Sequence, residues 1–309
     1  MSNKILLLYL TTSQKTELAK CEKVFRSVFR KFRKSAVFTY LQIDTSPSCM
    51  ELFCNKLSEE LKKNDAVFLC GDIPIHRKRI LLTDILKEYT EAHFLKGSVI
   101  CCPPSSLTIQ KEKNDIICTH TSDYENYKST AKIALKFAQS RKRSLTLCTD
   151  DNDGTGSFLK EALTELFDSK THIDAEHLSL EEALMICINT IPVFDTVLAT
   201  KQTADILKMH IGFNGRQRIP DGYSVIYTQH GKVYERQTFP YEQMSNLPIF
   251  TTLLAFSAML ENEFYMKNAA NWLKRAICVS FETHKNAEAD DFINRVISEI
   301  EKPMRTHTR

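Results

Sequence analysis

Apolar and polar residues along the chain follow two different spacings, which predict strands and helices in alternation. Short apolar runs typical of buried strands occupy Lys4–Leu10, Ala66–Cys70, Ser98–Cys102, Leu145–Cys148, Thr196–Ala199 and Ser224–Tyr227. Helical spacing covers Thr16–Lys34, Tyr127–Arg143, Gly156–Phe167, Leu180–Asn189, Pro248–Tyr265, Ala269–Phe281 and Asp290–Ile300. Strands that alternate with helices predict an α/β fold with a largely parallel sheet.

The length of 309 residues is enough for one large domain or two medium ones, and 43% of the residues are apolar. No apolar run approaches the roughly 20 residues needed to cross a bilayer. The first residues, MSNKILLLYL, lack a small-residue cleavage site and predict a first strand instead of a signal peptide. We therefore expect a cytoplasmic protein that does not insert into a membrane.

The ten cysteines form no CxxC motif and no Cys/His spacing of the kind that binds zinc. Cys70, Cys102, Cys118 and Cys148 each close a predicted strand. A reduced thiol at such a position behaves as a small hydrophobic side chain. The sequence favours buried, inert thiols, and a reactive cysteine among them is the alternative.

A basic stretch, Lys23–Lys34, lies in the first predicted helix, whose other face carries phenylalanines. It is either an anion or nucleic-acid patch or the solvated face of an amphipathic helix, and the second interpretation is the commoner one. The net charge of +3 is too small to imply nucleic acid by itself. We therefore do not expect nucleic acid to be the main partner.

Glycine is scarce, with only eight residues, whereas average usage of about 7% would give over twenty. The segment Asp150–Gly156 (DDNDGTG) joins a strand to a helix, but its spacing does not fit a calcium loop. Its aspartates would also repel a phosphate at the helix N-terminus. A polar turn between strand and helix is the simplest interpretation.

Three longer stretches, taken together, resemble the isocitrate/isopropylmalate dehydrogenase family. Tyr127–Asn152 resembles the family's helix and strand that end in V-D-K-A-N, and Glu181–Leu207 resembles the stretch around F-D-V-(I/V)-V-T and G-D-I-L-S-D. Tyr227–Leu260 resembles the segment E-P-x-H-G-S-A-P-D-I-A-G-x-x-x-A-N-P and the helix that follows it. The resemblance covers most of the chain with few identities.

The resemblance implies a two-domain α/β fold whose first domain is discontinuous. The first domain would contain residues 1–97 and 220–309, on the nucleotide side, and the second would contain residues 98–219. Members of the family oxidise and decarboxylate 2-hydroxy acids with NAD or NADP and a divalent cation, at a cleft completed by the dimer. The family's clasp arm would fall between Leu107 and Asn126, where this chain is short, so a homodimer would rest mainly on helices of the second domain.

Most of the family's catalytic side chains do not carry over. The catalytic lysine falls on Asp150, which reverses its charge. Two substrate arginines fall on Ile85 and Leu95, an asparagine falls on His93, and no match exists for the segment with the third arginine and the catalytic tyrosine. The first-strand loop G-D-G-I-G-P-E becomes Thr11–Glu17. We therefore assign no catalytic residue.

Several binding positions of the family do carry over. The family's metal aspartates fall on Glu181, Asp205 and Met209, of which only the two carboxylates suit Mg²⁺ or Mn²⁺. Asp205 is alternatively the N-cap of the helix that follows. The resemblance implies nucleotide contacts at His230, Gly231, Asn246 and Asn152. Basic residues at 77–79, 216 and 218 either form a new anion site or are solvated loop charges.

The sequence therefore favours a degenerate, non-catalytic relative of these dehydrogenases. It would bind an acidic metabolite or a nucleotide, or act as a partner subunit. One alternative is an active NAD(P)- and Mg-dependent dehydrogenase of a 2-hydroxy acid with altered substrate. The other is a nucleic-acid binder that uses the Lys23–Lys34 face.

Overall fold

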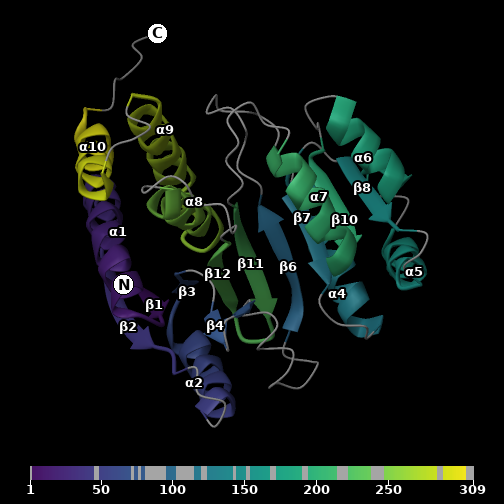
Figure 1. Ribbon diagram of the computed structural model, residues 1–309, viewed down its shortest axis with the longest axis horizontal. Helices are drawn as coiled ribbons and strands as arrows, with labels where there is room; N and C mark the ends of the chain where they lie inside the picture. The colour runs from purple at the N-terminus through teal and green to yellow at the C-terminus, as the bar shows by residue number, and fades with distance from the viewer. Residues whose placement is uncertain are drawn as a thin grey trace.

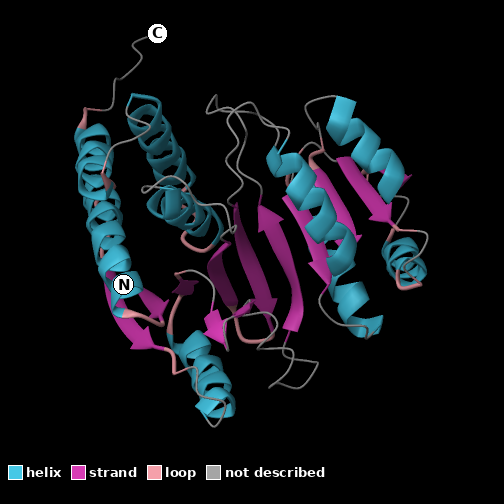
Figure 2. Ribbon diagram, in the orientation of Figure 1, coloured by secondary structure: helices cyan, strands magenta, loops and turns pink. Residues whose placement is uncertain are grey.

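The computed structural model describes fourteen stretches of the chain. They are residues 2–44, 49–70, 73–75, 78–80, 95–101, 115–119, 124–141, 144–150, 154–167, 172–189, 194–213, 222–237, 247–283 and 288–303. Helices and strands alternate through most of them (Figures 1 and 2). None of the helices within these stretches is long and apolar enough to span a bilayer.

The strands are short and the helices longer, as the spacing of apolar residues predicts. The strands are β1 (Asn3–Tyr9), β2 (Ala36–Gln42), β3 (Ala66–Leu69), β4 (Ile73–Ile75), β5 (Lys78–Ile80), β6 (Leu95–Cys101), β7 (Asp115–Thr119), β8 (Ser144–Thr149), β9 (Asp174–Ser179), β10 (Thr196–Thr200), β11 (Gly222–Thr228) and β12 (Lys232–Gln237). The helices are α1 (Thr12–Lys31), α2 (Met50–Lys63), α4 (Tyr124–Gln139), α5 (Gly156–Leu166), α6 (Leu180–Asn189), α7 (Lys201–Phe213), α8 (Leu247–Asn262), α9 (Lys267–Thr283) and α10 (Ala289–Glu301).

Ten of these strands form one sheet in the order β2-β1-β3-β12-β11-β6-β7-β10-β8-β9, and β4 and β5 form a separate small hairpin. β2, β1, β3 and β12 are parallel to one another, and so are β7, β10, β8 and β9. β11 and β6 lie between the two groups and make antiparallel pairs. The prediction of an α/β fold with a largely parallel sheet is confirmed.

The two faces of the sheet bury different residues of each strand. In β1, Ile5 and Leu7 belong to one apolar cluster, whereas Leu6 and Leu8 belong to another. In β10, Leu198 belongs to the same cluster as Ile5, whereas Val197 belongs to a third cluster. Because successive side chains of a strand point to opposite faces, the first cluster covers one face and the other two divide the opposite face.

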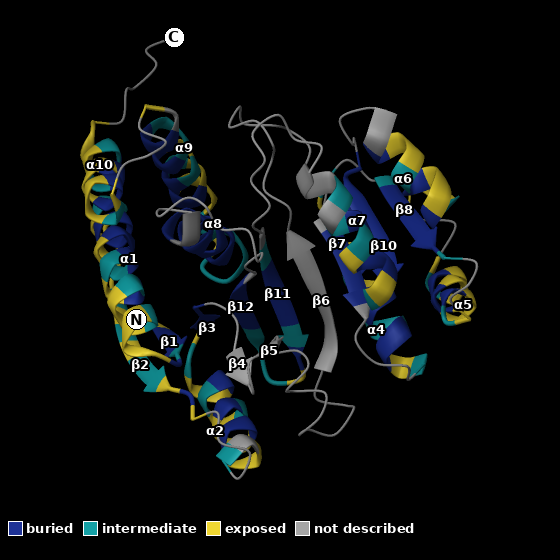
Figure 3. Ribbon diagram, in the orientation of Figure 1, coloured by how far each residue is buried: buried dark blue, intermediate teal, exposed yellow. Residues whose placement is uncertain are grey.

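We call the first side the broad face and the second side the split face. The broad face is covered by α1, α4, α5, α8, α9 and α10, whose buried side chains form one cluster with strands from both ends of the sheet. On the split face, α2 covers the β1 and β3 end, and α6 with α7 covers the β10 and β8 end (Figure 3). The broad face therefore holds a shared core, and the split face holds two smaller ones.

The predicted domain division can be compared with the order of strands, although it stays a prediction. Segments 1–97 and 220–309 supply β1, β2, β3, β11 and β12, which are neighbours at one end of the sheet. Segment 98–219 supplies β7, β8, β9 and β10, which are neighbours at the other end. The predicted boundary at 97/98 falls inside β6, which joins the two groups.

Helix α1 begins directly after Thr11, the first of three consecutive hydroxyl residues (Thr11, Thr12 and Ser13) whose side chains can cap a helix. The Thr11 side chain accepts a hydrogen bond from the Gln14 backbone N–H at 3.2 Å, and the Gln14 side chain accepts one from the Thr11 N–H. This reciprocal arrangement satisfies two N–H groups that have no partner within the helix. The helix therefore begins four residues before the predicted Thr16.

Candidate functional site

A pair of buried polar side chains lies on the two central strands of the split face. The Ser224 hydroxyl on β11 donates a hydrogen bond to the Glu235 carboxylate on β12 at 3.2 Å. Both side chains are almost fully buried. They alternate along the strands with Val225 and Tyr234, whose side chains belong to the broad-face cluster. A carboxylate is rarely buried in a core without a partner, so this pair marks the polar part of the split face.

Glu181, the first predicted metal ligand, lies in the first turn of α6 and is exposed. Its neighbour Glu182 has a different role. The Glu182 carboxylate accepts hydrogen bonds from the Ser179 N–H at 2.8 Å and the Ser179 hydroxyl at 3.0 Å. These bonds cap the helix and hold the pKa of Glu182 below its usual value. Glu181 therefore stands on a firmly anchored helix end and points toward solvent.

Asp205, the second predicted metal ligand, lies inside α7 and forms an ion pair with Lys201, one turn earlier. The interpretation of Asp205 as the N-cap is wrong. The helix begins at Lys201, and the Thr200 hydroxyl accepts a hydrogen bond from the Thr203 N–H at 3.4 Å. The ammonium group is paired with Oδ2 of Asp205, so a metal ion at this carboxylate would lie beside a positive charge that disfavours it.

The described residues do not gather a set of ligands around either carboxylate. Helices α6 and α7 pack against each other in one apolar cluster that contains Ala183, Cys187, Ala204 and Leu207. Within the described stretches, no group of three or more His, Cys, Asp or Glu side chains lies close enough together to hold a metal. The two exposed carboxylates suit a hard cation only in the type of their donor atoms, which are oxygens. The prediction of metal binding by Glu181 and Asp205 stays a prediction.

His230 and Gly231 lie in the tight turn that joins β11 to β12. The Thr228 N–H and hydroxyl both donate to the Gly231 carbonyl, at 2.9 and 2.8 Å. A Cβ on Gly231 would lie 3.3 Å from Leu61 Cδ2 of α2, so close packing already accounts for this glycine. Desolvation, and then the charge of Lys62, lowers the pKa of His230. The turn lies at the amino end of β12, whereas ligands of open α/β sheets usually lie at the carboxyl ends of strands.

Glu235 on β12 is a buried polar residue that the sequence analysis did not identify. The prediction followed the His230–Gly231 dipeptide, which precedes this strand. A single glutamate after Val233 and Tyr234 gave only a weak signal in the sequence.

Several of the predicted positions lie outside the described residues. These are Asn152 and Asn246, predicted to bind cofactor, together with Ile85, His93 and the basic residues at 77, 216 and 218. Leu95 is the first residue of β6, and Met209 lies within α7. Part of the expected clasp segment, Asp115–Thr119, is instead a central strand, β7.

Asp150, at the position of the family's catalytic lysine, directly follows β8 and is half-buried. The preceding residue, Thr149, contacts the His177 ring on β9, with 2.8 Å between Oγ1 and Nε2. A Cβ on Gly156 would lie only 3.0 Å from Thr149 Cβ, so the turn into α5 requires glycine for close approach. The described part of the polar turn is thus explained by packing.

A second polar cluster lies on the broad face around Glu17, which matches the last residue of the family's first-strand loop. Its Oε1 lies 3.4 Å from Arg236 Nη1, and it accepts hydrogen bonds from the Thr252 hydroxyl at 3.3 Å and the Cys70 thiol at 3.5 Å. Burial, and then the Glu17 charge, raises the pKa of Cys70 well above its usual value. This agrees with the expected inert thiols, since Cys118 and Cys148 are buried as well.

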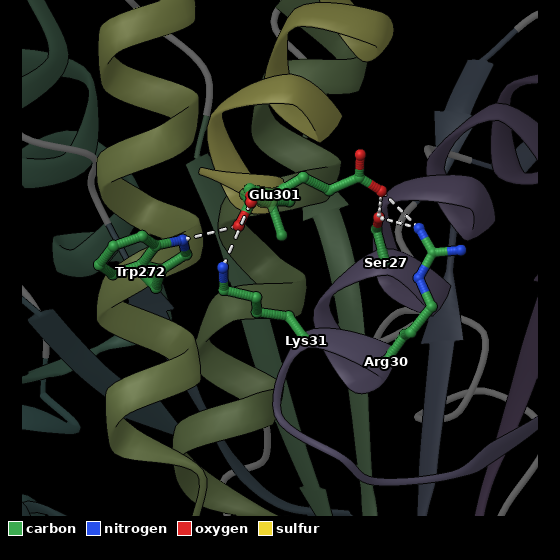
Figure 4. A network of polar contacts seen from close by, with 6 residues as sticks. Ser27, Arg30, Lys31, Trp272 and Glu301 are labelled. Carbon is green, nitrogen blue, oxygen red and sulfur yellow. Dashed lines mark hydrogen bonds and ion pairs between the residues drawn. The ribbon is translucent and has the colours of Figure 1, made fainter. Parts of the chain in front are cut away.

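The basic stretch Lys23–Lys34 is partly used to hold α10 (Figure 4). Arg30 pairs with Glu301, and the Lys31 ammonium donates to the backbone carbonyl of Lys302 at 2.6 Å. The Trp272 indole N–H donates to the Ile300 carbonyl at 3.2 Å. Lys31 and Trp272 thereby satisfy carbonyl groups at the C-terminus of α10, where cations are favoured. Part of the basic face is therefore structural.

Comparisons with known proteins identify the fold. No family model matches the sequence, and none of the curated proteins does. Three solved structures superpose with a TM-score of 0.75 each. They are the TT0538 protein of Thermus thermophilus, an isocitrate dehydrogenase of Methylococcus capsulatus and a β-decarboxylating dehydrogenase of Thermococcus kodakarensis.

The three alignments cover nearly the whole chain at low identity. The TT0538 protein is 13% identical, and the alignment covers 99% of this chain and 70% of that one. The isocitrate dehydrogenase is 12% identical, with 97% of this chain and 100% of that one covered. The β-decarboxylating dehydrogenase is 14% identical, with 97% of this chain and 96% of that one covered. The protein therefore has the fold of the isocitrate/isopropylmalate dehydrogenase family. The predicted fold is confirmed. Sequence identities this low are evidence for the fold only.

Proposed function

We propose that this protein is a degenerate relative of the isocitrate/isopropylmalate dehydrogenases that binds an acidic metabolite or a nucleotide, or partners another subunit, without oxidising a 2-hydroxy acid. The observation that carries the proposal is the ion pair between Lys201 and Asp205. It neutralises the carboxylate of this chain that best matches a metal ligand of the family. Asp150 adds a negative charge where the family uses a lysine.

The size of these effects favours the degenerate interpretation. Two unit charges about 4 Å apart interact by roughly 4 kcal/mol at an effective dielectric constant near 20. Replacing attractive groups around a dicarboxylate therefore removes much of its binding energy. Loss of a general acid or base alone lowers a rate by about 10²–10⁴-fold. Since both changes occur together, we expect no useful turnover.

The second candidate is an active NAD(P)- and Mg-dependent dehydrogenase with an altered substrate. The carboxylates of Glu235 and Glu181 favour it, because Glu235 is buried on the split face and Glu181 lies on α6, which covers one end of the same face. This candidate predicts that Mg²⁺ or Mn²⁺ with NAD raises the melting temperature, as any ligand selective for the folded state does.

One experiment separates the two candidates. Purified protein is incubated with Mn²⁺, NAD or NADP, and a panel of 2-hydroxy acids that includes isocitrate and isopropylmalate, and reduced nicotinamide is measured together with the melting temperature. We expect no reduced nicotinamide from the wild type. Substantial turnover of any of these acids would contradict the proposal.

A variant tests whether the ion pair between Lys201 and Asp205 hinders metal binding. In Lys201→Ala, Asp205 loses its partner, so we expect Mn²⁺ to bind more tightly than in the wild type, with a larger rise of the melting temperature. Lys160→Ala, an exposed lysine on α5, is the matched control and should behave as the wild type. Equal Mn²⁺ responses in all three proteins would show that Lys201 does not block the carboxylate.

Binding to nucleic acid is the weakest candidate, because Arg30 and Lys31 hold α10. Its test is retention on DNA or RNA at low salt, with release as salt rises. We expect no retention beyond that of a weakly basic protein.

We also propose that the protein forms a homodimer through helices of the second domain, with α6 at the contact. Met185 and Ile186 on α6 are 58% and 36% exposed, and two neighbouring exposed apolar side chains suit such a contact. Light scattering after gel filtration should give twice the mass of the chain, and Met185→Glu should favour the monomer. Free thiols at all described cysteines are typical of a reducing compartment, so we propose the cytosol.

A further inference from the structure

A groove of about 650 Å³ lies on the broad face, and nothing in the proposed function uses it. One wall is the C-terminal half of α4 with Ser140 and Arg141, and the other wall is the end of α8 and the start of α9. Tyr227 of β11 and Lys232 of β12 also line it. The volume falls within the range of about 300–1,000 Å³ that is usual for small-molecule sites.

The described lining of the groove carries five basic and two acidic side chains. Lys274 pairs with Glu261 at 3.2 Å, and Lys232 pairs with Glu263 at 2.8 Å. The exposed Lys136 and Lys267 have no acidic partner among the residues that the structure describes. The groove therefore has an excess of positive charge, which favours an anionic ligand.

Aromatic side chains accompany the positive charge. Phe137, Tyr227 and Tyr265 line the groove, and Tyr265 is 88% exposed. Tyr265 also has a left-handed backbone, with φ of 53°, a conformation that disfavours residues with a Cβ. A large exposed ring held in such a conformation is unusual. Rings of this kind offer a stacking surface to a flat ligand.

Asp195 completes the lining and is only 3% exposed. Its backbone carbonyl accepts a hydrogen bond from Arg141 Nη1 at 3.3 Å. Its carboxylate oxygen Oδ2 is buried, and no donor for it exists within the described stretches. Because Oδ2 has almost no accessible surface, a ligand in the groove does not reach it, and the Asp195 charge lies beneath the groove lining.

From the positive charge and the exposed aromatic ring we infer that the groove binds a nucleoside phosphate. The lysines suit the phosphate, and the ring of Tyr265 suits the base. The groove goes beyond the proposed function because it lies on the face opposite to α6 and α7, which carry Glu181 and Asp205. It also borders the C-terminal end of the 16-residue α8, so it lies roughly 24 Å from the N-terminal end of that helix.

The test is titration of the full-length protein with ADP that carries a fluorescent group on the ribose, followed by displacement with unlabelled ADP and with pyrophosphate. We expect saturable binding to the wild type. The double variant Lys136→Glu/Lys267→Glu should weaken it by about tenfold or more, because two favourable charges become repulsive. Tyr265→Ala should weaken ADP binding and leave the displacement by pyrophosphate unchanged.

The matched control is Lys23→Glu/Lys56→Glu, which changes the net charge equally at exposed lysines of α1 and α2 outside the groove. It should bind within about twofold of the wild type, because exposed charges far from the site are screened by salt. Absence of saturable binding to the wild type, or equal weakening in both double variants, would overturn the inference. Displacement by pyrophosphate as effective as by ADP would overturn the nucleoside part. Lys201→Ala should leave this binding unchanged, which separates the groove from the proposed function.

Discussion

The two faces of the sheet differ in how they bury the chain. On the broad face, strands from both ends of the sheet share one apolar cluster with six helices. On the split face, α2 and the pair α6–α7 cover separate clusters, and Ser224 and Glu235 are buried on the central strands. One face therefore has a single continuous apolar core, whereas the other has two separate cores. Each face also buries a polar group, the Glu17 cluster on the broad face and the Ser224–Glu235 pair on the split face.

This difference shows where the two groups of strands are held together and where they are packed separately. Apolar burial stabilises a fold without direction or specificity, so a continuous cluster unites the two groups of strands. Buried polar groups cost free energy unless they are paired, and they mark places where a protein does something besides fold. The predictions below test this contrast.

The largest expected effect is on the broad face, at Phe256. Its ring is fully buried and stacks on Phe25, with 3.4 Å between the ring centroids. Phe256→Ala should lower the free energy of unfolding by about 3–5 kcal/mol, because a large cavity replaces the ring. Urea unfolding followed by circular dichroism measures this loss. Val37→Ala, at a half-exposed position on β2, is the control and should change it by less than about 0.5 kcal/mol.

The same experiment tests whether the shared cluster unites the molecule. Trp272 on α9 is the only tryptophan, so its fluorescence reports one end of the sheet, whereas circular dichroism reports all helices. We expect both signals to change at the same urea concentration in the wild type. Two separate transitions would show that the predicted domains fold independently in spite of the common core.

A smaller effect is expected on the split face, at Ser224. Its hydroxyl donates to the buried Glu235 carboxylate, and a hydrogen bond to a charged group contributes about 1.5–3 kcal/mol. Ser224→Ala should lower the free energy of unfolding by that amount. Ser35→Ala, at an exposed serine, is the control. No loss in Ser224→Ala would show that Glu235 does not depend on this donor.

The smallest effect concerns the thiols of the split face. Burial raises the pKa of Cys54 from 9.0 to about 11, and burial likewise raises the pKa of Cys187 from 9.0 to about 11. The folded state thus keeps both protons at a pH where the unfolded chain releases them. The free energy of unfolding should be insensitive to these thiols below pH 9.0 and should fall as the pH rises toward about 11.

Urea midpoints measured across this range in the wild type and in Cys54→Ala/Cys187→Ala test the effect. The variant should lose less stability between pH 9.0 and 11 than the wild type does. A reagent for thiols should also label these two positions slowly in the folded protein at about pH 8, since little thiolate is present. Rapid labelling of Cys54 or Cys187 would contradict their burial.

Much of the fold could be predicted from local patterns. Helix α6 has the predicted bounds, and β1, β3, β10, α5 and α10 differ from the prediction by one or two residues at an end. Strands β2 and β9 were missed. In β2, exposed and half-buried residues replace an apolar run, and β9 is mostly exposed. Both are edge strands, and edge strands bury too little for their pattern to predict them.

The candidate sites were less predictable, because a motif gives spacing along the chain and not distance in space. The fragment around Asp205 matched the family, but only the start of α7 at Lys201 shows that a lysine lies one turn away and neutralises it. The His230–Gly231 dipeptide matched as well, but the pairing of β11 with β12 puts it in a hairpin turn.

The sequence alone determined the alternation of strands and helices, the cap at Thr11 and the buried thiols, because each depends on neighbours within a few residues or on hydrophobicity. The tertiary structure decided the rest. It placed Ser224 beside Glu235, Arg236 beside Glu17, and α4 opposite α9 across the groove. These contacts join residues that are far apart in sequence, and only the order and direction of the strands in the sheet bring them together.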